Sequence, residues 1–317
     1  MAEDKSNAGT KTIIIVSILL GVSLVTGTLF LGRIDSAESE LAPEATAEYG
    51  QRLLRDTVAL LGPDQADPNM RYSGNRLDCA SCHIDTGTEP GTLSLLQAAS
   101  RYPRFMGRDG GERDLKDRIN GCMQRSMNGR PFARDSIELA AMENYILSLG
   151  AQHAAMSESK TVAVEPPAFV EPQRRASVEV GQAVYEQRCQ ICHGSDGEGL
   201  KETTDIINGY LFPPVWGPDS YNNGAGMTRV LTAARFIKAR MPLGEATLTD
   251  DDAYDVSAYI NSQPRPIKSN LEQDYPDLSR KPVDSPYPPY ADTFSQDQHK
   301  YGPFEPIREY YENLRSN

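Results

Sequence analysis

The chain has 317 residues, of which 39% are hydrophobic and 24% are charged, and a formal net charge of −12. This length allows two compact domains with separate cores. The acidic balance argues against a nucleic-acid partner, because binding to phosphates needs a basic surface. Residues 71–134 depart from the average, with eleven Lys or Arg against seven Asp or Glu. On charge alone this stretch is a salt-bridged surface, although it would also suit a small anionic ligand.

The N-terminus predicts a membrane anchor. Two lysines precede residues 13–31, an apolar run interrupted only by Gly, Ser and Thr. A signal-peptide core takes about 7–15 residues and a bilayer span about 20, and no convincing Ala-x-Ala cleavage site follows. We therefore expect a cytoplasmic stretch at 1–11 and an uncleaved inner-membrane helix (or a signal peptide) at 12–32. A spacer at 33–44 would then lead into an exported, periplasmic remainder.

Two similar helical units follow the spacer. In the first, residues 45–61 predict a helix, and Asp135 is a suitable N-cap for a later helix that Gly150 would end. In the second, the corresponding helices are expected at 178–187 and 250–263. The later helices share the pattern Tyr-Ile-x-Ser, so an internal repeat is the simplest explanation.

Each unit also carries a Cys-x-x-Cys-His motif. Such a motif can bond two haem vinyl groups through thioethers while its histidine reaches the iron. A thioredoxin-like site would need a βαβ context, zinc would need a fourth ligand, and a plain disulfide would leave both histidines unexplained. We therefore predict two covalently bound haem c groups. The residues that would hold them are Cys79, Cys82 and His83 in the first unit and Cys189, Cys192 and His193 in the second.

These motifs predict an all-α fold with two cytochrome c-like domains in tandem. The first domain is expected at 45–150 and the second at 177–264. The segment between them, 151–176, lacks periodicity and contains three prolines, so we expect an extended linker.

The C-terminal residues 265–317 have a different composition. They contain many prolines and six tyrosines, and they show no helical period before Glu305. Composition alone would permit disorder, but the tyrosines together with Phe294 and Phe304 favour an irregular strap that packs over the domains.

The sixth iron ligand of the second haem is expected to be a methionine. Only four histidines are present, and the two outside the CxxCH motifs lie in the linker and the tail, which disfavours bis-histidine ligation. Met241 is placed where the distal loop of a small cytochrome c supplies a thioether. Lys238 is a neighbouring competitor, and Met227 fits core packing better.

Cys122, the fifth cysteine, occupies the approximately corresponding position in the first unit. Met123 and Met127 compete for the ligand role, although helical spacing places Met123 on an apolar ridge. An inert buried cysteine or an intermolecular disulfide would be the alternatives. Neighbouring cations favour the thiolate form. The residues that helical spacing places on the face of Cys122 are Arg118, Arg125 and Ser126.

The two expected ligand sets predict a direction for electron flow. A thiolate ligand should make the first haem hard to reduce, whereas a methionine on the second does the opposite. Electrons should therefore run from the first haem to the second and on to an external acceptor.

Several longer motifs resemble the dihaem thiosulfate dehydrogenase family. They include GNRLDCASCH, DRINGCMQRSMNGRP, KARMPLG, KPVDSPYPPY and QHKYGPFEPI, and the similarity runs from about Tyr49 to Ile307. The resemblance implies oxidation of two thiosulfates to tetrathionate, reversible in some members, with electrons passed to a cytochrome or similar acceptor. Implied iron ligands are His83 with Cys122, and His193 with Met241 or Lys238.

The resemblance also implies that substrate becomes attached to Cys122. Because thiosulfate is a dianion, bringing two of them together needs cationic groups to offset their repulsion. The candidates for this role are Arg108, Arg118 and Arg125, with Ser126 as a hydrogen-bond donor.

Other functions fit parts of the pattern. A dihaem cytochrome that only carries electrons would need neither a thiolate nor surrounding arginines. The haem subunit of a thiosulfate-binding sulfur-oxidising complex also uses a Cys-ligated haem, but it works with a separate carrier protein and partner cytochrome. A dihaem peroxidase would leave the lone cysteine unexplained.

Overall fold

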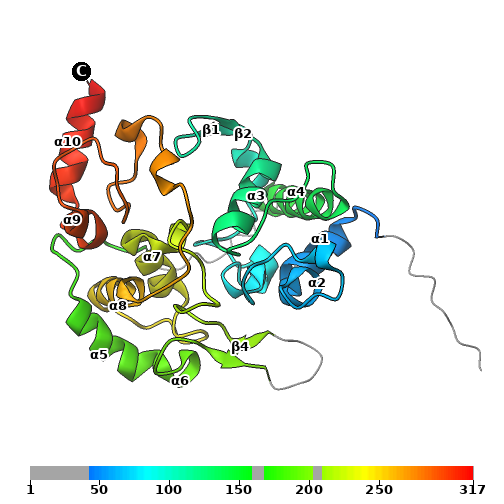
Figure 1. The fold of residues 1–317 in the computed structure, drawn as a ribbon, viewed down its shortest axis with the longest axis horizontal. Coiled ribbons are helices and arrows are strands. Elements are labelled where there is room, and N and C mark those ends of the chain that lie inside the picture. Colours follow the sequence, from blue (N-terminus) through cyan, green and yellow to red (C-terminus); the bar gives the residue numbers. More distant parts are fainter. Residues whose placement is uncertain (1–42, 159–167, 203–208, 317) are drawn as a thin grey trace, which may run out of the picture. The chain divides into compact units, whose positions relative to one another are not determined.

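The computed structural model describes residues 43–158, 168–202 and 209–316 (Figure 1). The predicted cytoplasmic stretch and membrane anchor lie outside these residues. Within the described ranges, none of the helices combines the length and the apolar composition that a membrane crossing requires.

The first unit is organised by the crossing of two helices, α1 (Ala47–Arg55) and α4 (Ile137–Glu158). The side chain of Thr46 caps α1 by accepting a hydrogen bond from the Tyr49 amide at 3.1 Å. The other helices of this unit are α2 (Thr57–Leu61) and α3 (Leu115–Arg125).

The second unit repeats this plan with α5 (Val178–Arg188) crossing α8 (Asp250–Ser262). A capping box formed by Thr249 and Asp252 begins α8. The other helices of this unit are α6 (Gln190–His193) and α7 (Val230–Arg240). Two tail helices follow, α9 (Gln296–Tyr301) and α10 (Glu305–Ser316).

Two small antiparallel ribbons and several 3₁₀ turns complete the described fold. In the first ribbon β1 (Arg104–Met106) pairs with β2 (Gly111–Arg113), and in the second β3 (Leu200–Lys201) pairs with β4 (Tyr210–Phe212). The helices therefore dominate, as predicted. The 3₁₀ turns are η1 (Pro68–Met70), η2 (Cys79–Ser81), η3 (Asp85–Gly87), η4 (Ala99–Arg101), η5 (Gly226–Thr228), η6 (Leu271–Gln273) and η7 (Leu278–Arg280).

Glycine permits the close approach of the helices at both crossings. A Cβ atom on Gly50 would lie 2.0 Å from the Ala141 carbonyl oxygen, and one on Gly181 would lie 2.0 Å from the Asp255 carbonyl oxygen. The next neighbours correspond as well, because they include Cβ of Tyr145 in the first unit and Cβ of Tyr259 in the second. The two tyrosines of the repeated sequence pattern therefore stand at equivalent places in the two folds.

The boundaries predicted for α4 are wrong at both ends. Ser136, not Asp135, stands before the helix, with its hydroxyl accepting from the Leu139 amide at 3.3 Å. Gly150 does not end the helix, which continues to Glu158. The first residues of the predicted linker are therefore helical, and residues 159–167 lie outside the described part.

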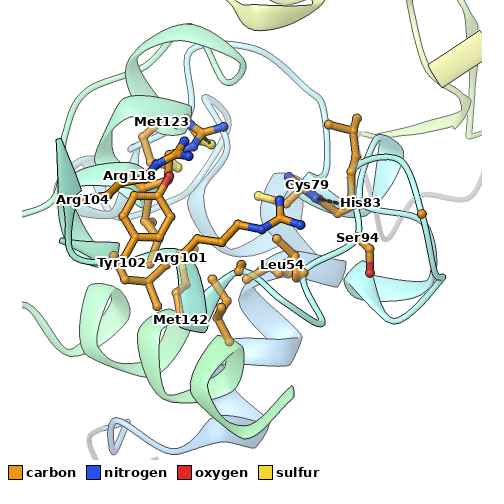
Figure 2. A pocket seen from close by; sticks show the side chains of 18 residues that line it. Leu54, Cys79, His83, Ser94, Arg101, Tyr102, Arg104, Arg118, Met123 and Met142 are labelled. Atoms are coloured by element: carbon orange, nitrogen blue, oxygen red, sulfur yellow. Dashed lines mark hydrogen bonds between the residues drawn. The ribbon is translucent and has the colours of Figure 1, made fainter. Parts of the chain in front are cut away.

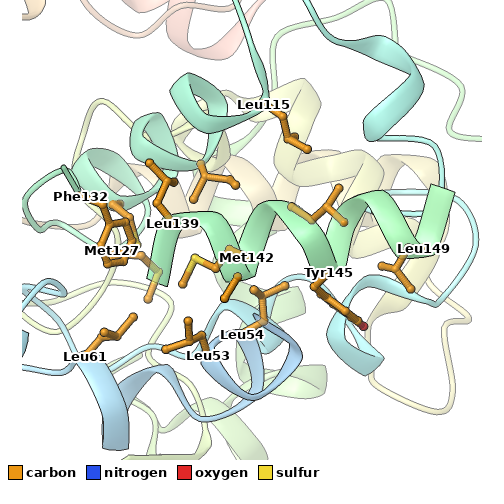
Figure 3. Close-up of a cluster of buried hydrophobic side chains, with 14 of the residues drawn as sticks. Leu53, Leu54, Leu61, Leu115, Met127, Phe132, Leu139, Met142, Tyr145 and Leu149 are labelled. Carbon is orange, nitrogen blue, oxygen red and sulfur yellow. The ribbon is translucent and has the colours of Figure 1, made fainter. Parts of the chain in front are cut away.

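The core of the first unit lies between α1, α3 and α4 (Figure 3). Leu53 and Leu139 are fully buried there, and Tyr145 hydrogen-bonds through its hydroxyl to Thr86 at 2.8 Å. Apolar side chains from three helices thus form one contact surface that positions the residues between them.

The C-terminal segment packs into the second unit (orange to red in Figure 1). Phe304, Ile307 and Tyr311 are buried in one cluster with residues of α7 and α8. His299 is also buried, with Nε2 3.0 Å from an Asp292 carboxylate oxygen and Nδ1 2.8 Å from a backbone carbonyl. Its two ring nitrogens are therefore engaged within the tail.

This segment also encloses the charged side chain of Lys281. The Lys281 side chain is only 2% exposed, and its ammonium group donates to the Pro289 carbonyl at 2.8 Å. The rings of Tyr287 and Tyr290 lie 4.6 and 5.1 Å from it. Burial lowers the pKa of Lys281 from 10.5 to about 8, opposed only in part by Asp274.

This arrangement predicts a pH-dependent contribution to stability. Between about pH 8 and 10.5 the unfolded chain binds more protons at Lys281 than the folded protein does, so stability rises with pH in this window. Relative to a Lys281→Met variant, the wild type should gain about 2 kcal/mol in free energy of unfolding between pH 7.5 and 10. Urea unfolding at both pH values measures this. Lys201→Met, at an exposed position, is the control. The prediction is contradicted if the wild type gains as much stability relative to Lys201→Met as it does relative to Lys281→Met.

Candidate functional site

A cavity of about 270 Å³ lies in the first unit (Figure 2). Its walls are largely apolar, with Leu54 from α1, Ile119 from α3 and Ile146 from α4. Cys79 and His83 of the CxxCH motif also line it, as does Cys122. The polypeptide thus forms an apolar hollow between the motif and α3.

Both CxxCH histidines are oriented in the same way. Nδ1 of His83 lies 2.7 Å from the Leu93 carbonyl oxygen, and Nδ1 of His193 lies 2.8 Å from the Pro213 carbonyl oxygen. Because a carbonyl only accepts, each Nδ1 donates its proton, which leaves the Nε2 lone pair available for a metal. Burial also lowers the pKa of His193, which favours the neutral, ligating form.

The cysteines of the motifs are not joined in disulfides, so both sulfurs of each motif can form thioethers. Burial raises the pKa of Cys79 to about 12 and that of Cys82 to about 11. Buried thiols at an apolar cavity, next to a histidine whose Nδ1 is held by a backbone carbonyl, fit the attachment of a haem c group. The residues present therefore agree with the cofactor that the sequence predicts.

Cys122 lies on α3, whose first turn is fixed by a capping box of Asp114 and Asp117. Nη1 of Arg118 donates to Cys122 Sγ at 2.9 Å. Burial opposes ionisation of the thiol, but the charge of Arg118 and the hydrogen bonds of His83 and Arg118 outweigh it and lower the pKa of Cys122 to about 7. Cys122 and His83 thus face the same cavity.

Arg125 and Arg108 are not among the side chains that line this cavity. Nη2 of Arg125 donates to Asp274 at 2.7 Å and Nη1 to the Gly224 carbonyl at 3.1 Å. Arg108 Nε lies 3.8 Å from the other oxygen of Asp274. Arg125 lies three residues after Cys122 on the same helix, but a carboxylate from the tail holds its guanidinium away from the cavity.

Ser126 does not line the cavity either. It follows the last residue of α3 as the C-cap, and its amide donates to the Cys122 carbonyl. The Ser126 carbonyl accepts from the Asn75 side chain at 2.9 Å. These contacts place Ser126 in the structure that ends α3.

Sequence reasoning missed several polar residues of the cavity wall, among them two arginines and a tyrosine. Arg101 ends η4, Tyr102 follows it, and Arg104 begins β1 (Figure 2). The Arg104 guanidinium stands 5.2 Å from the centre of the Tyr102 ring. The excess of basic residues in 71–134 was the sequence signal for a cationic site. Because these basic residues follow no regular spacing, the signal could not show which of them line the cavity.

In the second unit, Met241 and Met227 both pack against the cluster that contains Tyr185 and Trp216, and Cys189 packs there too. Lys238 is held by other groups, because Nζ donates to the Leu248 carbonyl at 2.7 Å. This contact occupies the amine that would compete with a thioether.

Comparison with known proteins finds a matching protein family for each of the two units. Residues 71–154 match the SoxA/TsdA cytochrome c domain family, and residues 176–260 match the family of cbb3-type cytochrome c oxidase subunit III. The prediction of two tandem cytochrome c domains is therefore confirmed, and with it that of two covalently bound haem c groups.

Curated relatives match across both units. A thiosulfate dehydrogenase of Allochromatium vinosum is 40% identical over 225 residues, which cover 69% of this chain and 77% of the relative. One from Stutzerimonas stutzeri is 39% identical over 63% of this chain and 64% of its own.

A solved structure agrees with these relatives. The "as isolated" form of the thiosulfate dehydrogenase (TsdBA) from Marichromatium purpuratum has a TM-score of 0.60 and 35% identity. The match covers 71% of this chain and 47% of that chain, so this chain spans about half of the solved protein and 64% of the Stutzerimonas relative. The chain belongs to the thiosulfate dehydrogenase family.

Proposed function

We propose that this protein oxidises two thiosulfates to tetrathionate in the periplasm and passes the electrons to an external cytochrome or similar acceptor. The observation that carries the proposal is the pairing of Cys122 with Arg118, 2.9 Å apart, in the cavity of a CxxCH motif. A protein that only carries electrons needs no reactive thiolate beside a cation. The relatives that match both units bear the name thiosulfate dehydrogenase.

The proposed chemistry uses the Cys122 thiolate as the point of attachment. Its Sγ forms a sulfur–sulfur bond with the outer sulfur of one thiosulfate, and this oxidation releases two electrons. A second thiosulfate then attacks the outer sulfur of the adduct, so that tetrathionate leaves and the Cys122 thiolate is restored. The second step transfers no further electrons, and no proton is consumed in either step.

The two haem groups, when bound, supply two one-electron acceptors, which matches the two electrons released. We propose that His83 and Cys122 would hold the iron of the first, and that His193 and Met241 would hold that of the second. The hydrogen bonds that orient both histidines support the first member of each pair. Attachment to the inner membrane through residues 12–32 stays a prediction.

Met241 is expected to tune the second haem. Replacing it with leucine should remove the thioether-to-iron charge-transfer absorption and lower the reduction potential of that haem. The expected change is on the order of 0.1 V within the roughly 0.8 V that axial ligands span. Spectroelectrochemical titration of the purified protein measures this. A Met227→Leu variant is the control, and loss of the band there alone would show that Met227 is the ligand.

Arg118 is expected to bind the substrate dianion as well as the thiolate. An Arg118→Gln variant should raise KM for thiosulfate by about tenfold to a hundredfold, because a charge-assisted hydrogen bond is lost. Steady-state kinetics with a cytochrome acceptor measure this. Arg113→Gln is the matched control, because that guanidinium pairs with Asp109 and does not line the cavity. A KM that rises equally in both variants would indicate a general charge effect.

The proposed function is tested by adding thiosulfate and an oxidised cytochrome to the purified protein. We expect tetrathionate to form with two equivalents of acceptor reduced per molecule. Reduction of the acceptor without tetrathionate would point to another sulfur product. Absence of both with several acceptors would favour the electron-carrier alternative.

A further inference from the structure

The end of the helix that carries Cys122 is held by the second cytochrome unit. Asn222 donates from its backbone amide to the Arg125 carbonyl at 3.1 Å. Its side-chain amide donates to the Gln124 carbonyl at 2.9 Å and to Oδ1 of Asn128 at 3.0 Å. The last carbonyls of a helix have no partner inside the helix. Asn222, which belongs to the second unit, supplies hydrogen-bond donors to those of α3, which belongs to the first unit.

Asn222 is itself held firmly. Its side chain is 1% exposed, and its Oδ1 accepts from the Gly224 amide at 3.1 Å. The Gly224 carbonyl accepts from Arg125, and an added Cβ on Gly224 would lie 2.7 Å from Arg125 Nη1. The loop at Gly224 is therefore in direct contact with the Arg125 side chain of α3.

A second amide spans the same junction. The side chain of Asn75, in the first unit, donates to the Ser126 carbonyl at 2.9 Å and to the Ser220 carbonyl at 3.2 Å. Asn75 is fully buried. Amides from both units thus fix the three carbonyls that follow Met123 along α3.

We propose that Asn222 is a positioning residue for Cys122. The capping box fixes the start of α3 and Asn222 fixes its end, so the thiol, one turn before that end, is held toward His83 and Arg118. This inference rests on the role proposed for Cys122. The geometry of the first site then depends on the second unit being docked against the end of α3.

An Asn222→Asp variant tests this selectively. A carboxylate keeps the acceptor for the Gly224 amide but places an oxygen where the donor to Gln124 was. Asn223→Asp is the matched control, since it adds the same charge to the neighbouring residue and keeps the acceptor that Asn223 offers to the Lys268 amide at 2.8 Å.

Two measurements on the purified holoprotein do not depend on turnover. Hydrogen exchange of the amides of residues 126–129 should become about tenfold faster in Asn222→Asp than in the control. The electron paramagnetic resonance signal of the oxidised first haem should broaden or split, because the thiolate takes up more than one geometry. In the kinetic assay kcat should fall while KM for thiosulfate stays within about twofold.

Unchanged exchange and an unchanged spectrum relative to Asn223→Asp would overturn the proposal. If the wild type forms no tetrathionate, the proposed function fails, but exchange and spectrum still decide the positioning role. If Asn222→Asp does not fold, the positioning role is tested by hydrogen exchange in an Asn128→Gly variant. Asn128 has a φ of 47°, which glycine adopts without strain, so this variant removes one contact. We then expect exchange about threefold faster, and no change would overturn the inference.

Discussion

Replacing Cys122 with methionine should abolish tetrathionate formation while both haem groups stay attached. A thioether can occupy a ligand position, but it has no ionisable proton and cannot exchange sulfur–sulfur bonds. The rate should therefore fall by on the order of a thousandfold or more, because the covalent step is lost. Serine at the same position should be equally inactive. Product assay and haem content on the same preparations check both statements.

Met127→Leu is the control for this experiment. Met127 is buried two residues beyond the end of α3 and does not line the cavity. Leucine conserves its volume, so the variant should keep the wild-type rate. Tetrathionate production at the full rate by Cys122→Met would eliminate a covalent role for the cysteine. The Arg118 contact would then serve only to bind substrate.

Patterns within ten to fifteen residues predicted the helices that cross in each unit. Apolar spacing indicated α1, α4, α5 and α8, because a helix closes its hydrogen bonds inside its own segment. Gly150 misled the same reasoning. A Cβ atom there would lie 3.1 Å from the side chain of Ala99, so the glycine permits a tertiary contact within α4 instead of ending it.

In the candidate site, too, local sequence patterns predicted contacts between neighbours in the chain but not contacts between distant segments. Helical spacing correctly related Cys122 to Arg118, four residues away, and the structure has them in contact. The spacing could not show where Arg125 points, because its partner Asp274 lies 149 residues further along the chain. The partners of Asn222 at the end of α3 lie 94 to 98 residues away from it in the sequence. Interactions between the two units therefore had no local signal.

The glycines at the two helix crossings should be intolerant of even one added methyl group. In Gly50→Ala the new Cβ would lie 2.0 Å from the Ala141 carbonyl oxygen, which is backbone and cannot turn aside. The helices must separate, and α1 and α4 carry Leu54, Met142 and Ile146 of the cavity wall. We expect a loss of about 3 kcal/mol or more in the free energy of unfolding and incomplete haem attachment.

Gly181→Ala should produce the corresponding loss in the second unit, because its Cβ would meet the Asp255 carbonyl oxygen at the same 2.0 Å. Gly226→Ala is the matched control, since among the described residues no atom beyond its chain neighbours lies within 4 Å of its added Cβ. Its free energy of unfolding should change by less than about 0.5 kcal/mol. Urea unfolding of the three variants separates local crowding from the general effect of replacing glycine in a helical protein. Equal losses in all three variants would mean that the crossing helices accommodate the methyl group. The contact between each glycine and the facing carbonyl oxygen would then not set the distance between the helices.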